Sequence, residues 1–219
     1  MTEIAVDAFN GCTGLTGNLT IPSSVILIKT NAFYQCSGFN GSLKFTNSVT
    51  YLGDYSFYEC SGFTGELIIP DSVNYLGNRN FSKCGSFTGL TIGNNVPKIL
   101  TMSFYQCFSM VGTISIPASV TEIHSWGLGG PRFTGILIIP ATVTFIGDKA
   151  FSSMQVTYIS YHYGTTIAQM NAFPIAPTVL TIAPTGQPSG QPTSQPTSEP
   201  LSKSVRDSVS TLLVGGHAI

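Results

Sequence analysis

The sequence is short of charge. Of its 219 residues, nine are Lys or Arg and ten are Asp or Glu, together 9%, whereas an ordinary soluble domain carries about 25%. With a formal net charge of -1, the chain lacks the basic surface with which nucleic-acid-binding and membrane-surface proteins hold phosphate groups. It also lacks an uninterrupted apolar run of about 18 residues, which a membrane-spanning helix needs. We therefore expect no nucleic-acid partner and no transmembrane segment in this chain.

Motifs that carry catalysis are missing too. The three histidines, His124, His162 and His217, stand at unrelated positions. The sequence has no nucleophile elbow, phosphate-binding glycine loop, dinucleotide-binding glycine motif or zinc-protease motif. Glu122 and His124 are two residues apart and so lie on one face of a strand, but such a pair is far more often solvated surface than an active site. The sequence predicts no enzyme, no cofactor and no metal site.

What the sequence has in abundance is repetition. One column recurs every 23 or 24 residues: Phe9, Phe33, Phe57, Phe81, Phe104, Leu128 and Phe151. Two further columns keep the same period: Ile21, Phe45, Ile69, Ile92, Ile116 and Ile139, and Val25, Val49, Val73, Val96, Val120 and Val143. Three columns in register over six units indicate a repeat protein, whose units bury their apolar sides only against neighbouring units.

A single repeat, read from Gly65, predicts two short strands. Leu67 and Ile69 alternate with other residues as in a half-buried strand, and Pro70 ends that strand because it cannot donate to a continuing ladder. A second extended segment over residues 73–76 leads into a tight turn, from which the recurring Phe and Cys point inward. The predicted fold is a right-handed solenoid of roughly six and a half coils, made of short strands with little helix.

The recurring pattern I-P-x-S-V-T-x-I-G-x-x-A-F-x-x-C resembles the BspA-like leucine-rich repeat. Residues 116–123 (IPASVTEI) and 139–147 (IPATVTFIG) match it closely, and the resemblance covers residues 1 to about 160. It implies a leucine-rich-repeat solenoid of the kind found on cell-surface and secreted binding proteins, with no catalytic residues to carry over.

Some units depart from the pattern. In the fourth, residues 93–95 (GNN) replace the proline turn, and the unit is one residue short; the coil around residues 126–131 lacks both Phe and Cys. Residues 2–4 align with residues 121–123, so the sequence starts inside a coil, without an N-terminal cap or signal peptide. We therefore expect an N-terminally truncated solenoid.

The cysteines share the period of the phenylalanines: Cys12, Cys36, Cys60, Cys84 and Cys107. A zinc site needs cysteines that converge in close pairs, and no such pair occurs. Neighbouring coils bring their Cα atoms within disulfide range, but parallel Cβ directions disfavour the bond. The sequence predicts a structural column of buried thiols, of which at least one stays free because five is odd.

Outward-facing aromatic columns are the candidate binding surface: Tyr34, Tyr58 and Tyr105 in one column, and Tyr51, Tyr75 and Phe145 in another. Ser82 shares the first column, and Lys98 and Glu122 share the second. Rigid, amphipathic tyrosines are frequent at binding interfaces, and rows of aromatic rings also suit sugars. Aromatic pairs across neighbouring strands can instead simply stabilise the sheet, and the sequence leaves both roles open.

The C-terminal part differs from the repeats. Residues 150–198 contain no Asp, Glu, Lys or Arg. We expect the solenoid over residues 1–163, a closing segment over 164–183, and a low-complexity Pro/Gln/Ser/Thr linker or stalk over 184–200, where proline recurs every four residues. Residues 201–219 are expected to be a weakly structured tail.

These features predict a non-catalytic binding or adhesion module that holds an unknown protein or glycan on its repeat surface. A cell-surface or extracellular location is suggested by the family resemblance and the stalk-like tract. The glycosylation sequons at Asn18, Asn40 and Asn80 are too frequent by chance in so Ser/Thr-rich a chain to locate it. The alternatives are an intracellular protein-interaction scaffold and the repeat arm of a larger multidomain protein.

Overall fold

A computed structural model describes residues 2–162, 166–167, 172–173 and 178–182. The chain divides into a unit of Met1–Pro184 and a unit of Thr185–Ile219, and all described residues belong to the first. The expected closing segment is therefore described only in part, and the expected linker at 184–200 and tail at 201–219 lie outside the described residues.

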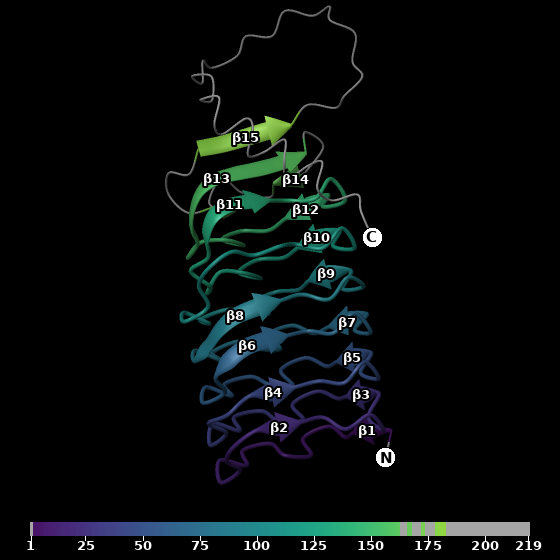
Figure 1. Cartoon of the computed structure of the whole chain (residues 1–219). Helices are drawn as coiled ribbons and strands as arrows, with labels where there is room; N and C mark the ends of the chain where they lie inside the picture. The colour runs from purple at the N-terminus through teal and green to yellow at the C-terminus, as the bar shows by residue number, and fades with distance from the viewer. Residues whose placement is uncertain (1, 163–165, 168–171, 174–177, 183–219) are drawn as a thin grey trace, which may run out of the picture. The chain divides into compact units, whose positions relative to one another are not determined.

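The first unit is a stack of about seven coils built from short parallel strands (Figure 1). The first strands of the coils form one column: β2 (Leu19–Thr20), β4 (Leu43–Lys44), β6 (Gly65–Ile68), β8 (Phe87–Thr91), β11 (Thr134–Ile138), β13 (Gln155–His162) and β15 (Thr178–Ile182). The second strands form another: β1 (Glu3–Ile4), β3 (Leu27–Ile28), β5 (Tyr51–Leu52), β7 (Tyr75–Leu76), β9 (Lys98–Ile99), β10 (Glu122–Ile123), β12 (Phe145–Ile146) and β14 (Thr166–Ile167). The described residues contain no α-helix, so the predicted solenoid with little helix is confirmed.

Within each column the strands pair in chain order, and both columns are interrupted. The second strands form two parallel sheets, β1-β3-β5-β7 and β9-β10-β12-β14. The first strands form three, β2-β4, β6-β8 and β11-β13-β15. Residues 112–117, which occupy the first-strand position between β8 and β11, are not a strand.

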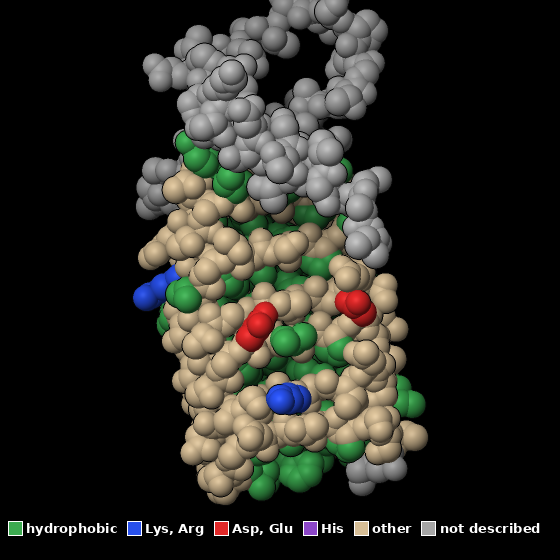
Figure 2. Space-filling view, viewed as in Figure 1, with side chains coloured by type: hydrophobic (Ala, Val, Ile, Leu, Met, Phe, Trp, Pro, Cys, Tyr) green, Lys and Arg blue, Asp and Glu red, His purple; other side chains and the backbone are tan. Residues whose placement is uncertain are grey.

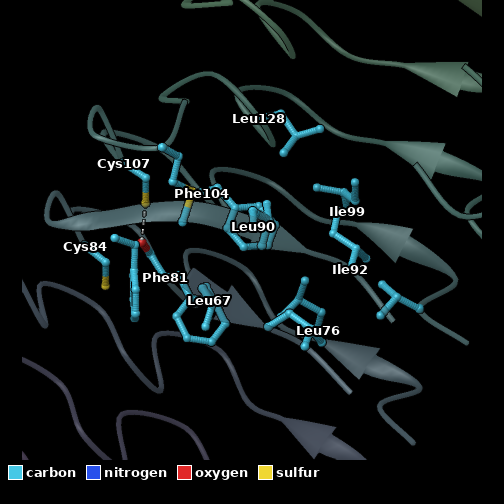
Figure 3. Packing of buried hydrophobic residues seen from close by; sticks show 14 of the residues in the cluster. Leu67, Leu76, Phe81, Cys84, Leu90, Ile92, Ile99, Phe104, Cys107 and Leu128 are labelled. Carbon is cyan, nitrogen blue, oxygen red and sulfur yellow. Dashed lines mark hydrogen bonds between the residues drawn. The ribbon is translucent and has the colours of Figure 1, made fainter. Parts of the chain in front are cut away.

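The core is a set of stacked side-chain columns. The rings of Phe33, Phe57, Phe81 and Phe104 stack at centroid distances of 5.1, 5.3 and 5.9 Å, with interplanar angles of 11° or less. Each of these four rings is 2% exposed or less. Figure 3 shows Phe81 and Phe104 packed beside Leu67, Leu90 and the cysteine column. Because each coil covers its neighbour, the apolar surface of the middle coils is removed from water.

The turn after each second strand uses left-handed backbone at residues other than glycine. Asn31, Tyr55, Arg79, Met102, Trp126 and Lys149 share one turn position, with φ between 50° and 59°. The amide of Tyr55 donates to Asn78 O of the next coil at 2.9 Å, whereas the amide of Ser56 donates locally to Gly53 O at 3.2 Å. Alternating bonds of this kind link the turns of successive coils and offset the strain of the left-handed residue.

Candidate binding surface

The second strands place tyrosines outward because the residue next to each tyrosine points into the core. In β5 and β7, Leu52 and Leu76 are buried, so the alternating Tyr51 and Tyr75 face out. These two tyrosines are paired in the parallel register, and their rings stack at 4.6 Å and 7°. The Tyr75 hydroxyl donates to Asp54 Oδ1 at 3.3 Å, and partial burial together with that carboxylate raises the pKa of Tyr75.

The following turns hold a second aromatic group. Tyr34 and Tyr58 stack at 4.9 Å and 9°. Tyr55 packs obliquely against both, with ring centroids 6.4 Å from Tyr34 and 5.6 Å from Tyr58. Tyr55 was not predicted as a binding residue from the sequence columns. Its turn position holds another large aromatic residue, Trp126, in a later coil, and this recurrence could have identified it.

Cations cover ring faces of these tyrosines. Lys29 Nζ lies 5.7 Å from the Tyr51 centroid, and Lys83 Nζ lies 5.1 Å from that of Tyr58. Each lysine also pairs with a carboxylate of the same surface, Lys29 with Glu3 and Lys83 with Glu59, both at 3.6 Å. Arg79 lies over the ring of Tyr55, 5.7 Å from its centroid, and donates to its hydroxyl at 3.2 Å.

The later coils carry a different aromatic cluster. Tyr105 meets Trp126 edge-on at 5.2 Å, and Lys149 Nζ lies 4.9 Å from the Trp126 ring. Phe145 packs against the ring of His124 at 5.4 Å. The six predicted residues therefore fall into separate contact groups, and all six are half-buried rather than fully exposed.

Glu122 organises the polar side of this later cluster. It forms an ion pair with Lys98 at 2.7 Å and a hydrogen bond with His124 Nε2 at 2.8 Å. These two partners lower the pKa of Glu122, so the carboxylate is ionised at neutral pH. We call the whole surface the aromatic face, made of Tyr34, Tyr51, Tyr55, Tyr58, Tyr75, Tyr105, Trp126 and Phe145 with their charged neighbours.

The cysteine column points inward. All five thiols are free; Cys36, Cys60, Cys84 and Cys107 are buried and Cys12 is half-buried. The Sγ of each buried cysteine donates to the carbonyl oxygen of the recurring Phe in the preceding coil at 2.9 to 3.0 Å, as drawn in Figure 3 for Cys107 and Phe81. Burial raises the pKa of Cys84, and raises that of Cys107 to about 12.

We expect these thiols to react unequally with a water-soluble disulfide reagent. Because the reagent must reach the sulfur from solvent, the folded chain should show a fast phase from half-buried Cys12 and a slow phase from the four buried cysteines. Spectrophotometric thiol counting before and after guanidinium measures both phases, and Cys12→Ser should remove the fast one. Two intramolecular disulfides in non-reducing mass analysis would contradict the thiol column.

The side chains of the three sequon asparagines form hydrogen bonds between neighbouring coils. The Asn18 and Asn40 side chains are exposed and accept amide hydrogen bonds from Ser42 at 2.7 Å and Gly17 at 2.9 Å, respectively, in neighbouring coils. Asn80 is fully buried, and its side-chain nitrogen donates to Gly53 O at 2.6 Å. In the folded chain Asn80 is therefore a structural residue and is closed to glycosylation.

Among the described residues, no group of three or more His, Cys, Asp or Glu side chains is placed to hold a metal ion. Over the same residues, no helix has the length and apolar character needed to cross a membrane. His124 belongs to the Glu122 pair. The side chain of His162 and the whole of His217 lie outside the described part of the chain.

Comparison with known proteins identifies a family model and two solved structures with similar repeats. A family model described as "BspA type Leucine rich repeat region" matches in six copies, over residues 2–128 and 63–179. A leucine-rich cell-surface protein from Faecalibacterium prausnitzii A2-165 is 20% identical, with a TM-score of 0.48, over 83% of this chain and 64% of that one. A leucine-rich repeat protein from Bacteroides ovatus ATCC 8483 is 17% identical, with a TM-score of 0.38, over 83% and 66%.

The chain thus spans less than two thirds of the length of either solved structure. No curated protein matches it. The family model, in contrast, covers more than half of the chain with repeated copies in the period of the coils. This chain therefore belongs to the family of BspA-type leucine-rich repeat proteins.

Proposed function

We propose that this chain is a non-catalytic binding module and that the aromatic face holds a protein partner. The observation that carries the proposal is the concentration of tyrosine edges and hydroxyls over the second strands and their turns. Tyrosine supplies large contact area with little loss of side-chain entropy, which is why it recurs in binding interfaces. The half-buried rings are already ordered by stacking, so little further ordering is needed when a partner binds.

A glycan fits this face less well than a protein. Sugar rings stack on open aromatic faces, but here the faces of Tyr51 and Tyr58 lie between a stacked tyrosine on one side and a lysine on the other. What remains accessible of these two tyrosines is ring edges and hydroxyl groups, beside paired charges. Such a surface suits the mixed polar and apolar contacts of a protein interface.

We place the module at the cell surface or outside the cell, displayed on the Pro/Ser/Thr tract of residues 184–200. One observation favours the alternative of an intracellular scaffold or the repeat arm of a larger protein. All five cysteines are free, as in a reducing compartment. Labelling of intact producing cells with a membrane-impermeant biotin reagent separates the two locations.

The test of the aromatic face replaces Tyr34, Tyr58 and Tyr105 by serine. Serine is the natural occupant of this column at Ser82, so we expect the variant to fold. The probe is a protein captured by the wild-type chain from a cell-surface extract and then purified. If the tyrosines are interface residues, its affinity measured by surface plasmon resonance should fall about tenfold or more.

The matched control carries Thr20→Ser and Lys44→Ser, two exposed positions of the first-strand column, and should bind as the wild type does. A second variant, with phenylalanine at the three tyrosine positions, keeps the stacking and removes only the hydroxyls. Unchanged affinity in both tyrosine variants would mean that the rings only stabilise the stack and that the protein interface lies elsewhere.

A further inference from the structure

The column of first strands is interrupted between β8 and residues 112–117. In three other coils an isoleucine amide at the end of the strand donates to the next coil: Ile21 to Lys44 O, Ile69 to Thr91 O and Ile139 to Ser160 O, at 2.8 to 2.9 Å. The equivalent amide, that of Ile92, has no such partner among the described residues, and residues 113–116 form no hydrogen bond within that part of the chain. Backbone donors and acceptors are therefore left unpaired on both sides of this junction.

A one-residue difference in length accompanies the interruption. Leu67 in β6 lies four positions after Phe63, whereas Leu90 in β8 lies only three positions after Phe87. Between β6 and β8 the mismatch is absorbed by an irregularity at Gly65/Glu66. The following coil restores the longer spacing, and its residues 112–117 form no ladder with β8.

The opening is a slot that is closed at both ends. At one end the Val111 amide donates to Thr88 O at 3.1 Å, and at the other the Thr121 amide donates to Pro97 O at 2.9 Å. The inward side chains at Leu90, Ile92, Ile114 and Ile116 are buried and close its floor. An inserted peptide strand would have to break the end contacts, whereas a compact ligand entering from the solvent side would not.

The slot has a volume of about 520 Å³, within the range of small-molecule pockets. Its polar walls are formed by Glu66, Asp71, Thr91, Asn94, Thr113 and Ser115. No Lys or Arg is among the described residues that line it. Figure 2 looks onto the strands of this column and shows a surface mostly of backbone and neutral polar side chains, with few charged groups.

The hydrogen-bonding groups that line the slot indicate the chemical class of its ligand. Glu66 Oε1 accepts a hydrogen bond from Thr91 Oγ1 at 2.6 Å, and Asp71 Oδ1 accepts one from the Asn94 amide at 2.7 Å. The second oxygen of each carboxylate has no hydrogen-bond partner within the described chain. Carboxylates and unpaired carbonyls need donors, and unpaired amides need acceptors. Hydroxyl groups supply both, while an anion would be repelled by the carboxylates.

We propose that this slot binds a neutral sugar unit, whose neighbouring hydroxyls bridge the unpaired backbone of β8 and of residues 112–117. The site is distinct from the aromatic face, because it lies over the first strands rather than the second strands and their turns. It gives the chain a second binding activity, toward carbohydrate, beside the proposed protein contact. Because the bonds are to neutral hydroxyls, binding should depend little on salt.

The experiment uses an array of neutral and sialylated glycans, followed by titration of the best-bound neutral monosaccharide, as its methyl glycoside, into the labelled chain by NMR. We expect neutral glycans to bind and the monosaccharide alone to shift amide signals around Thr91 and Ser115. The slot variant is Thr91→Ile with Ser115→Ile. Isoleucine occupies the same column naturally at Ile68 and Ile138, so the repeats accept it there.

The slot variant should weaken monosaccharide binding about tenfold or more, and Thr20→Ile, in the same column of the first coil, should leave it unchanged. Failure of every neutral glycan to bind, or binding of sialylated glycans only, would overturn the proposal. So would sugar binding that survives the slot variant, or that is lost in the Tyr34→Ser, Tyr58→Ser, Tyr105→Ser chain instead. Failure of the proposed protein contact would leave these sugar measurements unaffected, so the two proposals are tested separately.

Discussion

Truncation of Phe81 to alanine should lower the free energy of unfolding by about 4 kcal/mol. The ring is fully buried, stacks on Phe57 and Phe104 at 5.3 and 5.9 Å, and meets the edges of Phe45 and Phe87 at 6.4 and 6.5 Å. Its removal leaves a cavity in a middle coil and breaks contacts with both neighbouring coils. Urea denaturation followed by circular dichroism measures the loss.

The matched control for this prediction is Phe9→Ala. Phe9 belongs to the same column but is 39% exposed, and among the described residues its ring stacks only on Phe33, at 5.0 Å. Because the ring is already partly in water and loses one stacking contact, we expect its truncation to lower stability by about 1 kcal/mol. Equal losses at the two positions would show that stacking between coils does not determine stability, contrary to a nearest-neighbour description of the repeats.

The repeat period was sufficient to predict the path of each coil. Leu67 and Ile69 are buried as their alternation indicates, and β6 ends at Ile68, before Pro70. The second extended segment is β7, and Phe81 and Cys84 both point into the core after it. These features follow from side-chain polarity and from the missing amide of proline, which are local properties repeated in every coil.

Features that depend on contacts between coils were not visible in the sequence. The left-handed turn holds Tyr55 and Arg79 rather than glycine, because inter-coil hydrogen bonds outweigh the local preference. The shortened fourth coil was recognised at its altered proline turn, but the missing residue lies between Phe87 and Leu90. The slot lies between two coils of different length, and neither coil shows it alone.

Gly62 illustrates the same dependence at a single position. Its backbone lies so close to the preceding coil that a Cβ atom would collide with the carbonyl oxygen of Phe39 and come within 2.8 Å of that of Ser37. Both obstacles are backbone atoms of the preceding coil, so a side-chain rotation cannot relieve the contact. The glycine is required for close approach of the chains.

Replacement of Gly62 by alanine should therefore force two coils apart and lower the free energy of unfolding by about 3 kcal/mol. Gly14 is the control, because it occupies the same column in the first coil, where a Cβ meets nothing within 4 Å. Gly14→Ala should change stability by less than about 0.5 kcal/mol, or raise it slightly by restricting the unfolded chain. Urea denaturation distinguishes the two variants directly. If Gly62→Ala were as stable as Gly14→Ala, the glycine column would reflect turn preference alone, and the spacing of the coils would not be fixed by backbone contact at this position.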